Sequence, residues 1–286
     1  MNKTSIIGVD LGGTYIRGAR INAETITEIV SVKVSSSGTE EKVLDELYQL
    51  IDGLMDESVT AIGIGVPSVV DIEKGIVYDV QNIPSWKKVL LKQYLEARYG
   101  ITAYVNNDAN CFVLGEKYFG KARNYHSFIG LTIGTGLGAG IMINNKLYTG
   151  ANCGAGEFGM VDYNGYPFEY FTSGQFFLKQ YHEEGEYLYD KAMKGDAAAV
   201  KCFEAFGTHL GNAIKMILYT YDPALIIIGG SIKKVYPYFQ KTMWDCINTF
   251  AYQKSLGHLS IEISDLKHCG VLGAGALCYD AGSLVL

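Results

Sequence analysis

The sequence predicts an α/β fold with two domains, and three observations support this. Its length of 286 residues suits two domains or one large one. A glycine-rich strand-turn-strand segment occurs twice, at Ile6–Ile21 and Phe128–Ile143, and the copies align without a gap at an offset of 122 residues. The predicted strands form two sets, each mixed with helices, and we place the boundary near Val105–Asn106.

The first set begins with a meander of three strands that are rich in β-branched residues and separated by turn residues: Ile6–Asp10, Tyr15–Ile21 and Thr27–Val34. A helix follows over Glu40–Met55, where apolar residues recur at helical spacing on one face. Four shorter elements complete the set: a strand at Ala61–Val66, a hairpin at Val69–Tyr78, a helix at Leu90–Tyr99 and a strand at Ala103–Val105. A helix at Cys111–Phe119 follows the boundary.

The second set begins at Phe128 and turns at Asn144-Asn145, a dipeptide that suits positive φ in a tight hairpin. Helices dominate from Gly174 to Tyr221, and the longest covers Ala197–Tyr219. Two strands and a closing helix end the set: Ala224–Ile228, Leu259–Ile263 and Val271–Tyr279.

The composition predicts a cytoplasmic protein that binds neither nucleic acid nor membrane. The chain is 48% hydrophobic and 19% charged, so it can bury a sizeable core. Its net charge is −6, and it has no block of lysine and arginine that would indicate a nucleic-acid surface. No signal-peptide pattern occurs at the N-terminus, and no stretch approaches the roughly 20 apolar residues that span a bilayer. The six cysteines are scattered without a Cys-x-x-Cys pair, which is typical of reduced thiols.

The first glycine turn follows an apolar strand and reads Asp10-Leu-Gly-Gly-Thr14. Gly12 and Gly13 let the backbone turn so that its N–H groups can point at phosphate oxygens, and Thr14 adds a hydroxyl donor. Asp10 is placed to hold Mg²⁺ through water, because Mg²⁺ keeps much of its hydration shell. An ordinary glycine hairpin explains this turn equally well when it is taken alone.

The second turn repeats the pattern as Gly134-Thr-Gly-Leu-Gly138. Two such turns favour a clamp for a polyphosphate, with Thr135 and Gly136 in the second. No Gly-Lys-Ser/Thr follows either copy, so neither is the lysine-bearing phosphate loop. Each turn leads to a strand, whereas the dinucleotide-binding fingerprint leads to a helix.

Asn107-Asp108 lies where a predicted strand meets a predicted helix. A carboxylate there could accept the proton of a hydroxyl as its oxygen attacks phosphorus. The alternative is that Asp108 only caps the helix, a position that Asp often takes. Asn107 could orient a hydroxyl-rich ligand.

Two further segments carry candidates with open alternatives. Glu157 lies in the glycine-rich segment Asn152–Asp162, and Glu169 follows twelve residues later. These carboxylates could accept hydrogen bonds from sugar hydroxyls, or they could be solvated loop charges. Gly229-Gly230 could let adenine or ribose approach the backbone closely, or could form a strand-to-helix turn.

The order of these motifs resembles the ROK family (repressor, open reading frame, kinase). Five segments carry the resemblance: Asp-x-Gly-Gly-Thr, Asn-Asp-Ala-Asn, Thr-x-Gly-Thr-Gly-x-Gly, Glu-x-Gly, and a late Asp-Pro-x₃-Ile-Ile-Gly-Gly. The resemblance implies the ATPase fold of sugar kinases, actin and heat-shock chaperones, with two α/β domains around a central cleft. It implies residues 1–105, completed by a C-terminal helix over about 271–286, as one domain, and 106–270 as the other.

The resemblance also implies roles for residues. Asp108 looks like the catalytic base, and four residues look like sugar ligands: Asn82, Asn107, Glu157 and Glu169. Five residues look like the phosphate clamp: Gly12, Gly13, Thr14, Thr135 and Gly136. Gly229 and Gly230 look like the adenosine side. The implied cofactors are ATP and Mg²⁺, the implied ligand is a small sugar, and the implied assembly is a homodimer.

The chain departs from the family pattern after Glu157. The family usually reads Glu-x-Gly-His and then a cysteine-rich segment that binds structural zinc, but here Met160 replaces the histidine and DYNGYPFE follows without cysteine. We therefore predict no zinc site and a loop held by the packing of its aromatic residues. Met160 cannot donate a comparable hydrogen bond, so the sugar pocket should be less polar there.

The resemblance leads us to expect an ATP-dependent hexose kinase acting on the 6-hydroxyl of glucose or a close relative. A β-glucoside or N-acetylhexosamine kinase is an alternative, because β-glucoside kinases of the family resemble this chain in lacking the zinc cysteines. A sugar-sensing transcriptional regulator is an alternative of another class. Such regulators add an N-terminal helix-turn-helix, for which a first strand starting at Ile6 leaves no room.

Overall fold

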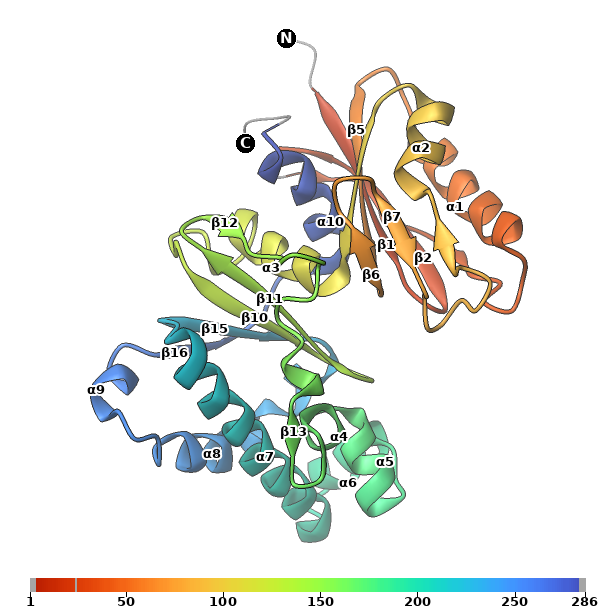
Figure 1. The fold of residues 1–286 in the computed structure, drawn as a ribbon. Helices are drawn as coiled ribbons and strands as arrows, with labels where there is room; N and C mark the ends of the chain where they lie inside the picture. The colour runs from red at the N-terminus through yellow and green to blue at the C-terminus, as the bar shows by residue number, and fades with distance from the viewer. Residues whose placement is uncertain (1–3, 24, 283–286) are drawn as a thin grey trace. The chain divides into compact units, whose positions relative to one another are not determined.

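The computed structural model describes residues 4–23 and 25–282, and it confirms the mixed α/β fold (Figure 1). By its contacts the chain divides into two compact units. The first comprises Met1–Tyr125, Gly140–Ala155 and Asp265–Leu286, and the second comprises His126–Ala139 and Gly156–Ser264. This division differs from the predicted boundary near residue 105, because the helix after that boundary groups with the first unit.

The first unit is built on a sheet in the order β3-β2-β1-β5-β9, with β4 also paired to β2. Its strands are β1 (Ser5–Leu11), β2 (Tyr15–Asn22), β3 (Thr25–Ile26), β4 (Val30–Lys33), β5 (Val59–Val66) and β9 (Thr102–Asn107). β1 pairs antiparallel with β2 and parallel with β5, which pairs parallel with β9. The carboxyl ends of β1, β5 and β9 therefore meet at one edge of the sheet, which is where ligands bind in open α/β sheets.

Helices cover both faces of this sheet. Figure 1 shows α1 (Glu40–Leu54) and α2 (Leu91–Tyr99) on one face and α10 (Cys269–Asp280) on the other. α10 also packs along α3 (Asp108–Tyr118). The backbone of α10 lies directly on the sheet, since a Cβ added at Gly8 or Gly63 would overlap it. Only glycine permits so close an approach of helix and strand.

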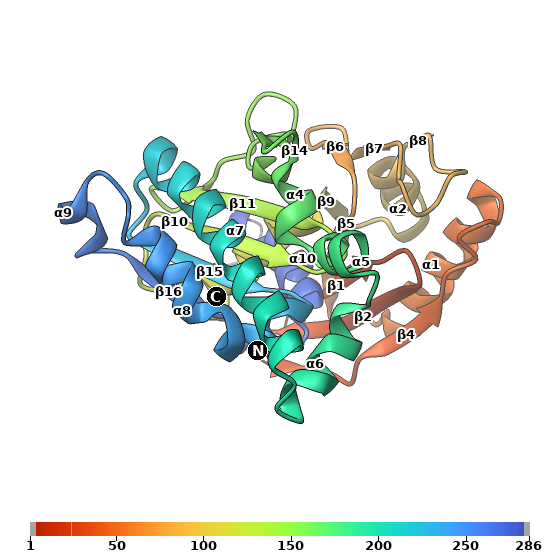
Figure 2. The same ribbon diagram turned by 90° about the horizontal axis from the view of Figure 1, so that it is seen from below.

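The second sheet has the order β12-β11-β10-β15-β16. Its strands are β10 (Phe128–Ile133), β11 (Leu137–Ile143), β12 (Lys146–Leu147), β15 (Leu225–Gly229) and β16 (Ser260–Ile263). β10, β15 and β16 run parallel, so the turn after β10 and the end of β15 lie at one edge. Figure 2 shows α7 (Ala197–Tyr221) and α8 (Tyr236–Ile247) on one face of this sheet.

Shorter elements complete the described chain. Three small strands form a sheet and two form a hairpin: β6 (Val69–Asp71), β7 (Ile76–Tyr78) and β8 (Lys88–Val89), then β13 (Asp162–Tyr163) and β14 (Tyr166–Pro167). The remaining helices are short: η1 (Phe158–Met160), α4 (Phe168–Thr172), α5 (Gly174–Tyr181), α6 (Gly185–Met193), η2 (Ser231–Val235) and α9 (Gln253–Leu256). In the part of the chain that the structure describes, no helix is both long and apolar enough to cross a membrane.

The strand predicted over Thr27–Val34 is confirmed only over β4 (Val30–Lys33). Residues 27–29, between β3 and β4, are not in a strand. Thr27 explains the break: its hydroxyl accepts a hydrogen bond from the Arg20 backbone N–H at 3.0 Å, and its own N–H donates to the Arg20 carbonyl at 2.9 Å. The predicted turn at Asn144-Asn145 is confirmed, with φ of 50° and 61°.

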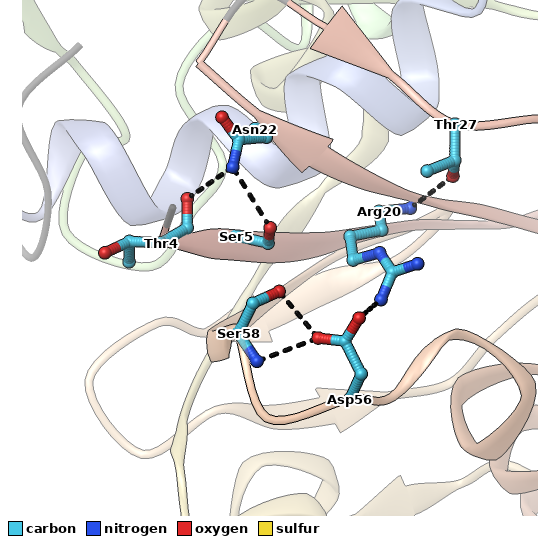
Figure 3. Close-up of polar contacts among 7 residues, drawn as sticks. All are labelled: Thr4, Ser5, Arg20, Asn22, Thr27, Asp56 and Ser58. Atoms are coloured by element: carbon cyan, nitrogen blue, oxygen red, sulfur yellow. Dashed lines mark hydrogen bonds and ion pairs between the residues drawn. The ribbon is translucent and has the colours of Figure 1, made fainter. Parts of the chain in front are cut away.

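Polar contacts fix the far edge of the first sheet, where β1 and β5 begin (Figure 3). Asn22 Nδ2 donates to Ser5 Oγ at 3.3 Å, which joins the end of β2 to the start of β1. Arg20 pairs with Asp56. The Asp56 carboxylate also accepts from the backbone N–H of Ser58 at 2.8 Å, just before β5. These contacts lie at the end of the strands opposite to the glycine turn.

Candidate active site

The first predicted phosphate turn joins β1 to β2. The N–H of Gly12 donates to the Tyr15 carbonyl at 3.0 Å and closes the turn. Asn82 lies against it, because a Cβ added to Gly13 would lie 2.5 Å from the Asn82 Cβ. Thr14 exposes its side chain. The structure therefore brings Asn82, a predicted sugar ligand, into contact with a predicted phosphate turn.

Asp10 is the penultimate residue of β1, beside this turn. Burial raises the pKa of its carboxyl, and the charge of Arg17, its partner across β2, opposes that rise. Gly270 in the first turn of α10 also lies against it, since a Cβ there would be 2.7 Å from Asp10 Oδ2. The N-terminal end of a helix favours a negative charge. This carboxylate fits a Mg²⁺ ion, which binds through one or two carboxylates and the substrate's phosphates and retains several waters.

The sheet register places Asp10 near the predicted catalytic base. Asp10 pairs with Gly65 on β5, and Gly65 pairs with Asn106 on β9, two residues before Asp108. The pKa of the buried Cys111 thiol is raised well above its usual range, mainly by burial and then by the charges of Asp108 and Asp10. The charges of both carboxylates therefore act on the Cys111 thiol, and both carboxylates lie near the carboxyl ends of the strands of the first sheet.

At the junction of β9 and α3, Asn107 caps the helix, and the next residue, Asp108, is the candidate catalytic base. Asn107 is the N-cap residue, and its side-chain oxygen accepts from the Ala109 N–H at 2.9 Å. Its Nδ2 donates to the Ser68 carbonyl at 3.2 Å, which fixes the side chain. Asp108 is exposed in the first helical turn, and its Oδ1 also accepts from the Ala109 N–H, at 2.8 Å. The helix has its cap in Asn107, so capping alone does not account for Asp108.

Two buried amides that sequence reasoning missed hold this junction. Asn106 Oδ1 accepts from the Asn107 N–H at 2.8 Å and from Asn110 Nδ2 at 2.9 Å. Asn110 Nδ2 also contacts Cys153 Sγ at 3.5 Å. Asn106 is 3% exposed and Asn110 is 2% exposed, so these contacts are shielded from water. The sequence signal for this structural role is the polar segment Asn-Asp-Ala-Asn, because buried amides keep hydrogen-bond partners.

The second predicted phosphate turn is fastened to Glu169. The Gly134 N–H donates to the Gly136 carbonyl at 3.0 Å, and Thr135 lies exposed between them. Glu169 Oε2 accepts from the Leu137 N–H at 3.0 Å. The carboxylate lies so close that a Cβ added to Gly136 would be 2.5 Å from Oε2. Glu169 thus binds protein backbone here, a role that the sequence does not predict.

The structure brings Glu157 and Glu169 together. The pKa of the Glu157 carboxyl is raised, first by burial and then by the charge of Glu169. Two carboxylates that act on one another this way present several acceptor positions to one ligand, as sugar hydroxyls require.

An aromatic cluster holds the loop between these two glutamates. The rings of Tyr163 and Phe168 stack with centroids 4.4 Å apart, and Phe171 lies 4.8 Å from the His209 ring on α7. The Tyr163 hydroxyl lies 3.2 Å from His209 Nδ1. Met160 is 60% exposed. Over residues 4–23 and 25–282, no group of three or more His, Cys, Asp or Glu side chains is placed to hold a metal ion.

A hollow of about 410 Å³ lies beside the second turn. It is lined from the turn, α5, α6, α7 and η2, by residues including Gly134, Thr135, Gly174, Gln175, Phe177, Tyr189, Phe203, Ser231 and Lys234. Gly230 has φ of +84°, and a Cβ there would overlap the Ile133 backbone, so the strand-to-η2 turn requires glycine. Gly229 and Gly230 do not line the hollow themselves, but the next residue, Ser231, does. The lining side chains lack a signal in the sequence.

The predicted residues fall into two groups. The first unit holds Asp10, Gly12, Gly13, Thr14, Asn82, Asn107 and Asp108, and the second holds Thr135, Gly136, Glu157, Glu169, Gly229 and Gly230. Each group combines a glycine turn after a parallel strand with polar ligands. In the first group the turn accompanies a candidate base and a candidate magnesium ligand, and in the second it accompanies two carboxylates and the hollow.

The profile of the ROK family matches residues 6–281, nearly the whole chain. The chain belongs to the ROK family. A ROK relative, the glucokinase of Thermotoga maritima, is 28% identical over 97% of this chain and 98% of its own length. The xylose repressor of Bacillus spizizenii is 30% identical over 96% of this chain and 77% of its own length.

Solved ROK structures confirm the fold. The ROK family glucokinase of Streptomyces griseus, in complex with glucose and AMPPNP, superposes with a TM-score of 0.81. It is 27% identical, and the alignment covers 96% of this chain and 98% of that one. The chain therefore has the actin-like ATPase fold of ROK sugar kinases.

Proposed function

We propose that this ROK protein is an ATP-dependent sugar kinase that transfers the γ-phosphoryl group to a hexose, most simply to the 6-hydroxyl of glucose. The observation that carries the proposal is the β9–α3 junction. Asn107 caps the helix, while Asp108 lies exposed at the carboxyl edge of the first sheet, near Asp10. An acceptor carboxylate next to a magnesium-binding carboxylate is what phosphoryl transfer to a hydroxyl requires.

In the proposed reaction Asp108 accepts the proton of the sugar hydroxyl as its oxygen attacks the γ-phosphorus in line. Asn82, Asn107, Glu157 and Glu169 bind the remaining sugar hydroxyls. Backbone N–H groups of the two glycine turns donate to phosphate oxygens and stabilise the developing charge. Asp10 would hold Mg²⁺ through water, and the ion would supply charge neutralisation at the phosphates. The adenosine part of ATP occupies the 410 Å³ hollow, a volume ordinary for a small-molecule site.

The relatives support this proposal and one alternative. The glucokinase of Thermotoga maritima and this chain match over nearly their full lengths, which favours a kinase. The match to a xylose repressor favours a sugar-binding regulator without turnover. The retained carboxylates, Asp10 and Asp108, favour the kinase, because sugar binding alone needs neither a base nor a magnesium ligand. We further propose that the enzyme is cytoplasmic and homodimeric.

Two measurements test the proposal. ATP consumption with free hexoses, N-acetylhexosamines and β-glucosides separates the hexose, N-acetylhexosamine and β-glucoside kinase alternatives, and turnover of no sugar would favour the regulator. Asp108→Asn is expected to lower turnover to under about 1% of wild type, since general base catalysis typically contributes 10²–10⁴-fold. Sugar binding should remain largely intact. The matched control is Asp45→Asn, an exposed position on α1, which should leave the rate unchanged. An Asp108→Asn enzyme that keeps more than a few per cent of the rate refutes the assignment.

A further inference from the structure

The Glu169 carboxylate is held at both oxygens by one unit of the protein. Oε2 accepts from the Leu137 N–H at 3.0 Å, and Oε1 accepts from Gln175 Nε2 at 2.9 Å. An ionised carboxylate has about four acceptor positions, so two hydrogen bonds leave room for sugar hydroxyls. Glu169 therefore can bind a sugar without releasing either protein donor.

The start of α5 is attached to the same turn. The Gly174 N–H donates to the Gly134 carbonyl at 2.7 Å. Ser173 is fully buried, caps α5 by accepting from the Gln175 N–H at 3.2 Å, and donates its hydroxyl to the Glu169 carbonyl at 2.7 Å. The backbone of Gln175 is thereby fixed with respect to both Glu169 and the glycine turn. The Gln175 side chain can still rotate, and its conformation decides whether the amide contacts Glu169 and which other group it contacts.

Gln175 also lines the 410 Å³ hollow, together with Gly134 and Thr135 of the turn. A glutamine amide carries two N–H donors, and the single side-chain bond described above, to Glu169, uses one. The second N–H belongs to a half-buried side chain that lines the proposed nucleotide site. An N–H donor beside the phosphate turn suits a phosphate oxygen, because hydrogen bonds to charged acceptors are the strong ones.

We propose that Gln175 is a positioning residue that couples sugar binding to nucleotide binding. One of its side-chain N–H groups donates to Glu169, and the other donates to a phosphate oxygen of the nucleotide in the hollow. Gln175 already donates to Glu169 without a sugar, and a sugar hydroxyl bound to Glu169 restrains the carboxylate further, and with it the Gln175 amide, before the nucleotide arrives. This inference rests on the proposed function and adds the residue that links its two substrates.

The link has a measurable consequence, because coupling between two ligands is reciprocal. A sugar should tighten AMPPNP binding, and AMPPNP should tighten sugar binding, by the same factor of about fivefold or more. Replacing Gln175 by methionine keeps the length and apolar volume of the side chain and removes both donors. Gln180→Met is the matched control: it lies on the same helix, is exposed, and donates to the Tyr170 hydroxyl at 3.2 Å, away from the hollow.

The experiment is calorimetric titration of AMPPNP with Mg²⁺ into wild type, Gln175→Met and Gln180→Met, with and without saturating sugar. The sugar is the one with the highest turnover on the panel, or glucose if none is turned over. Without sugar, Gln175→Met should bind AMPPNP about tenfold more weakly, as loss of a hydrogen bond to a charged group implies. With sugar, its coupling factor should fall to about 1, while sugar binding without nucleotide stays near the wild-type value because the Leu137 N–H still holds Glu169. The melting temperature should fall by a few degrees, because the variant loses the hydrogen bond from Gln175 Nε2 to Glu169. Gln180→Met should match wild type throughout.

Two results would overturn the inference: Gln175→Met binding AMPPNP within twofold of wild type, or Gln175→Met keeping the wild-type coupling factor. A wild-type protein without coupling would overturn it as well. A wild-type protein that phosphorylates no sugar refutes the proposed function instead, and the AMPPNP titration without sugar still decides whether Gln175 contacts the nucleotide.

Discussion

Gly136→Ala is the sharpest perturbation of the second glycine turn. A Cβ at this position would lie 2.5 Å from Glu169 Oε2, whereas ordinary contacts begin at 3.4 Å. The backbone φ of Gly136 is not in the left-handed region, so alanine is disfavoured by this contact and not by the turn itself. The carboxylate must therefore withdraw, by 0.9 Å if the contact is to reach 3.4 Å.

A withdrawal along the line of the hydrogen bond from the Leu137 N–H, now 3.0 Å, lengthens it to about 3.9 Å, which is no longer a hydrogen bond. Hydrogen bonds to charged groups contribute about 1.5–3 kcal/mol, so we expect a loss of about 2 kcal/mol in the free energy of unfolding. For a chain of this size that corresponds to a melting temperature lowered by about 3 °C. Misplacing a substrate-binding group by 1 Å can cost about 10²-fold in rate, which sets the expected fall in kcat/KM for the sugar.

Gly134→Ala is the matched control in the same turn. A Cβ there would meet Ser231 Oγ at 3.7 Å, an ordinary contact, so stability and sugar affinity should stay near wild type. Calorimetric melting and sugar titration of the two variants measure the difference. Equal melting temperatures for Gly136→Ala and Gly134→Ala would refute the reasoning, since the two variants differ in the contact with Glu169.

Glu157→Gln should stabilise the folded chain at neutral pH and weaken sugar binding, because burial and Glu169 raise the pKa of Glu157 in the folded state. The gain in the free energy of unfolding should vanish below the ordinary pKa of 4.5, where Glu157 is protonated in both the folded and the unfolded chain. It should grow as pH rises from there through the raised pKa of the folded state. Melting curves that show a gain independent of pH would contradict this. Gly270→Ala places a Cβ 2.7 Å from Asp10 Oδ2 and should raise the Mg²⁺ concentration for half-maximal rate about tenfold. Gly53→Ala, with nothing within 4 Å, is its control, and identical Mg²⁺ titrations would reject the Asp10 assignment. A zinc-selective chelator should leave the melting temperature and the Mg²⁺-supported rate unchanged, and loss of half the rate would reveal a metal site.

The elements that the sequence predicts well are those with local causes. The glycine turns after β1 and β10 need backbone freedom at fixed positions, and the flanking strands need β-branched residues, so both leave a pattern in the sequence. The strand predicted over Thr27–Val34 begins only at Val30, for a reason that no local pattern shows. The hydroxyl of Thr27 accepts a hydrogen bond from the backbone N–H of Arg20 on the neighbouring strand. Side-chain bonds to the backbone compete with strand pairing in this way.

The roles of individual site residues depend on contacts between distant segments. The sequence marks Glu169 as a ligand candidate, but its bond to the Leu137 N–H joins residues 32 positions apart. Likewise Gln175 is a candidate nucleotide ligand because it lines a hollow that five separate segments build. Residue type and spacing indicate which chemistry is available, and only the packed chain determines which donor meets which acceptor.

The aromatic loop affects how Glu157 and Glu169, the two proposed sugar ligands, are held. A structural zinc fixes its ligands through four strong bonds, whereas each aromatic pair contributes about 0.5–1.5 kcal/mol. The rings of Tyr163 and Phe171 pack onto His209, and the Phe168 ring stacks on Tyr163. Burial lowers the pKa of His209 and so favours its neutral form, in which Nδ1 can accept from the Tyr163 hydroxyl. Glu169 follows Phe168 directly and is anchored on its other side by the hydrogen bond from the Leu137 N–H at the end of the glycine turn. Its position is therefore set by ring packing from one direction and by the turn from the other. A change in ring size within this loop should shift the carboxylate by fractions of an ångström while the phosphate turn stays in place. Differences in sugar preference among relatives with this loop should follow from such changes.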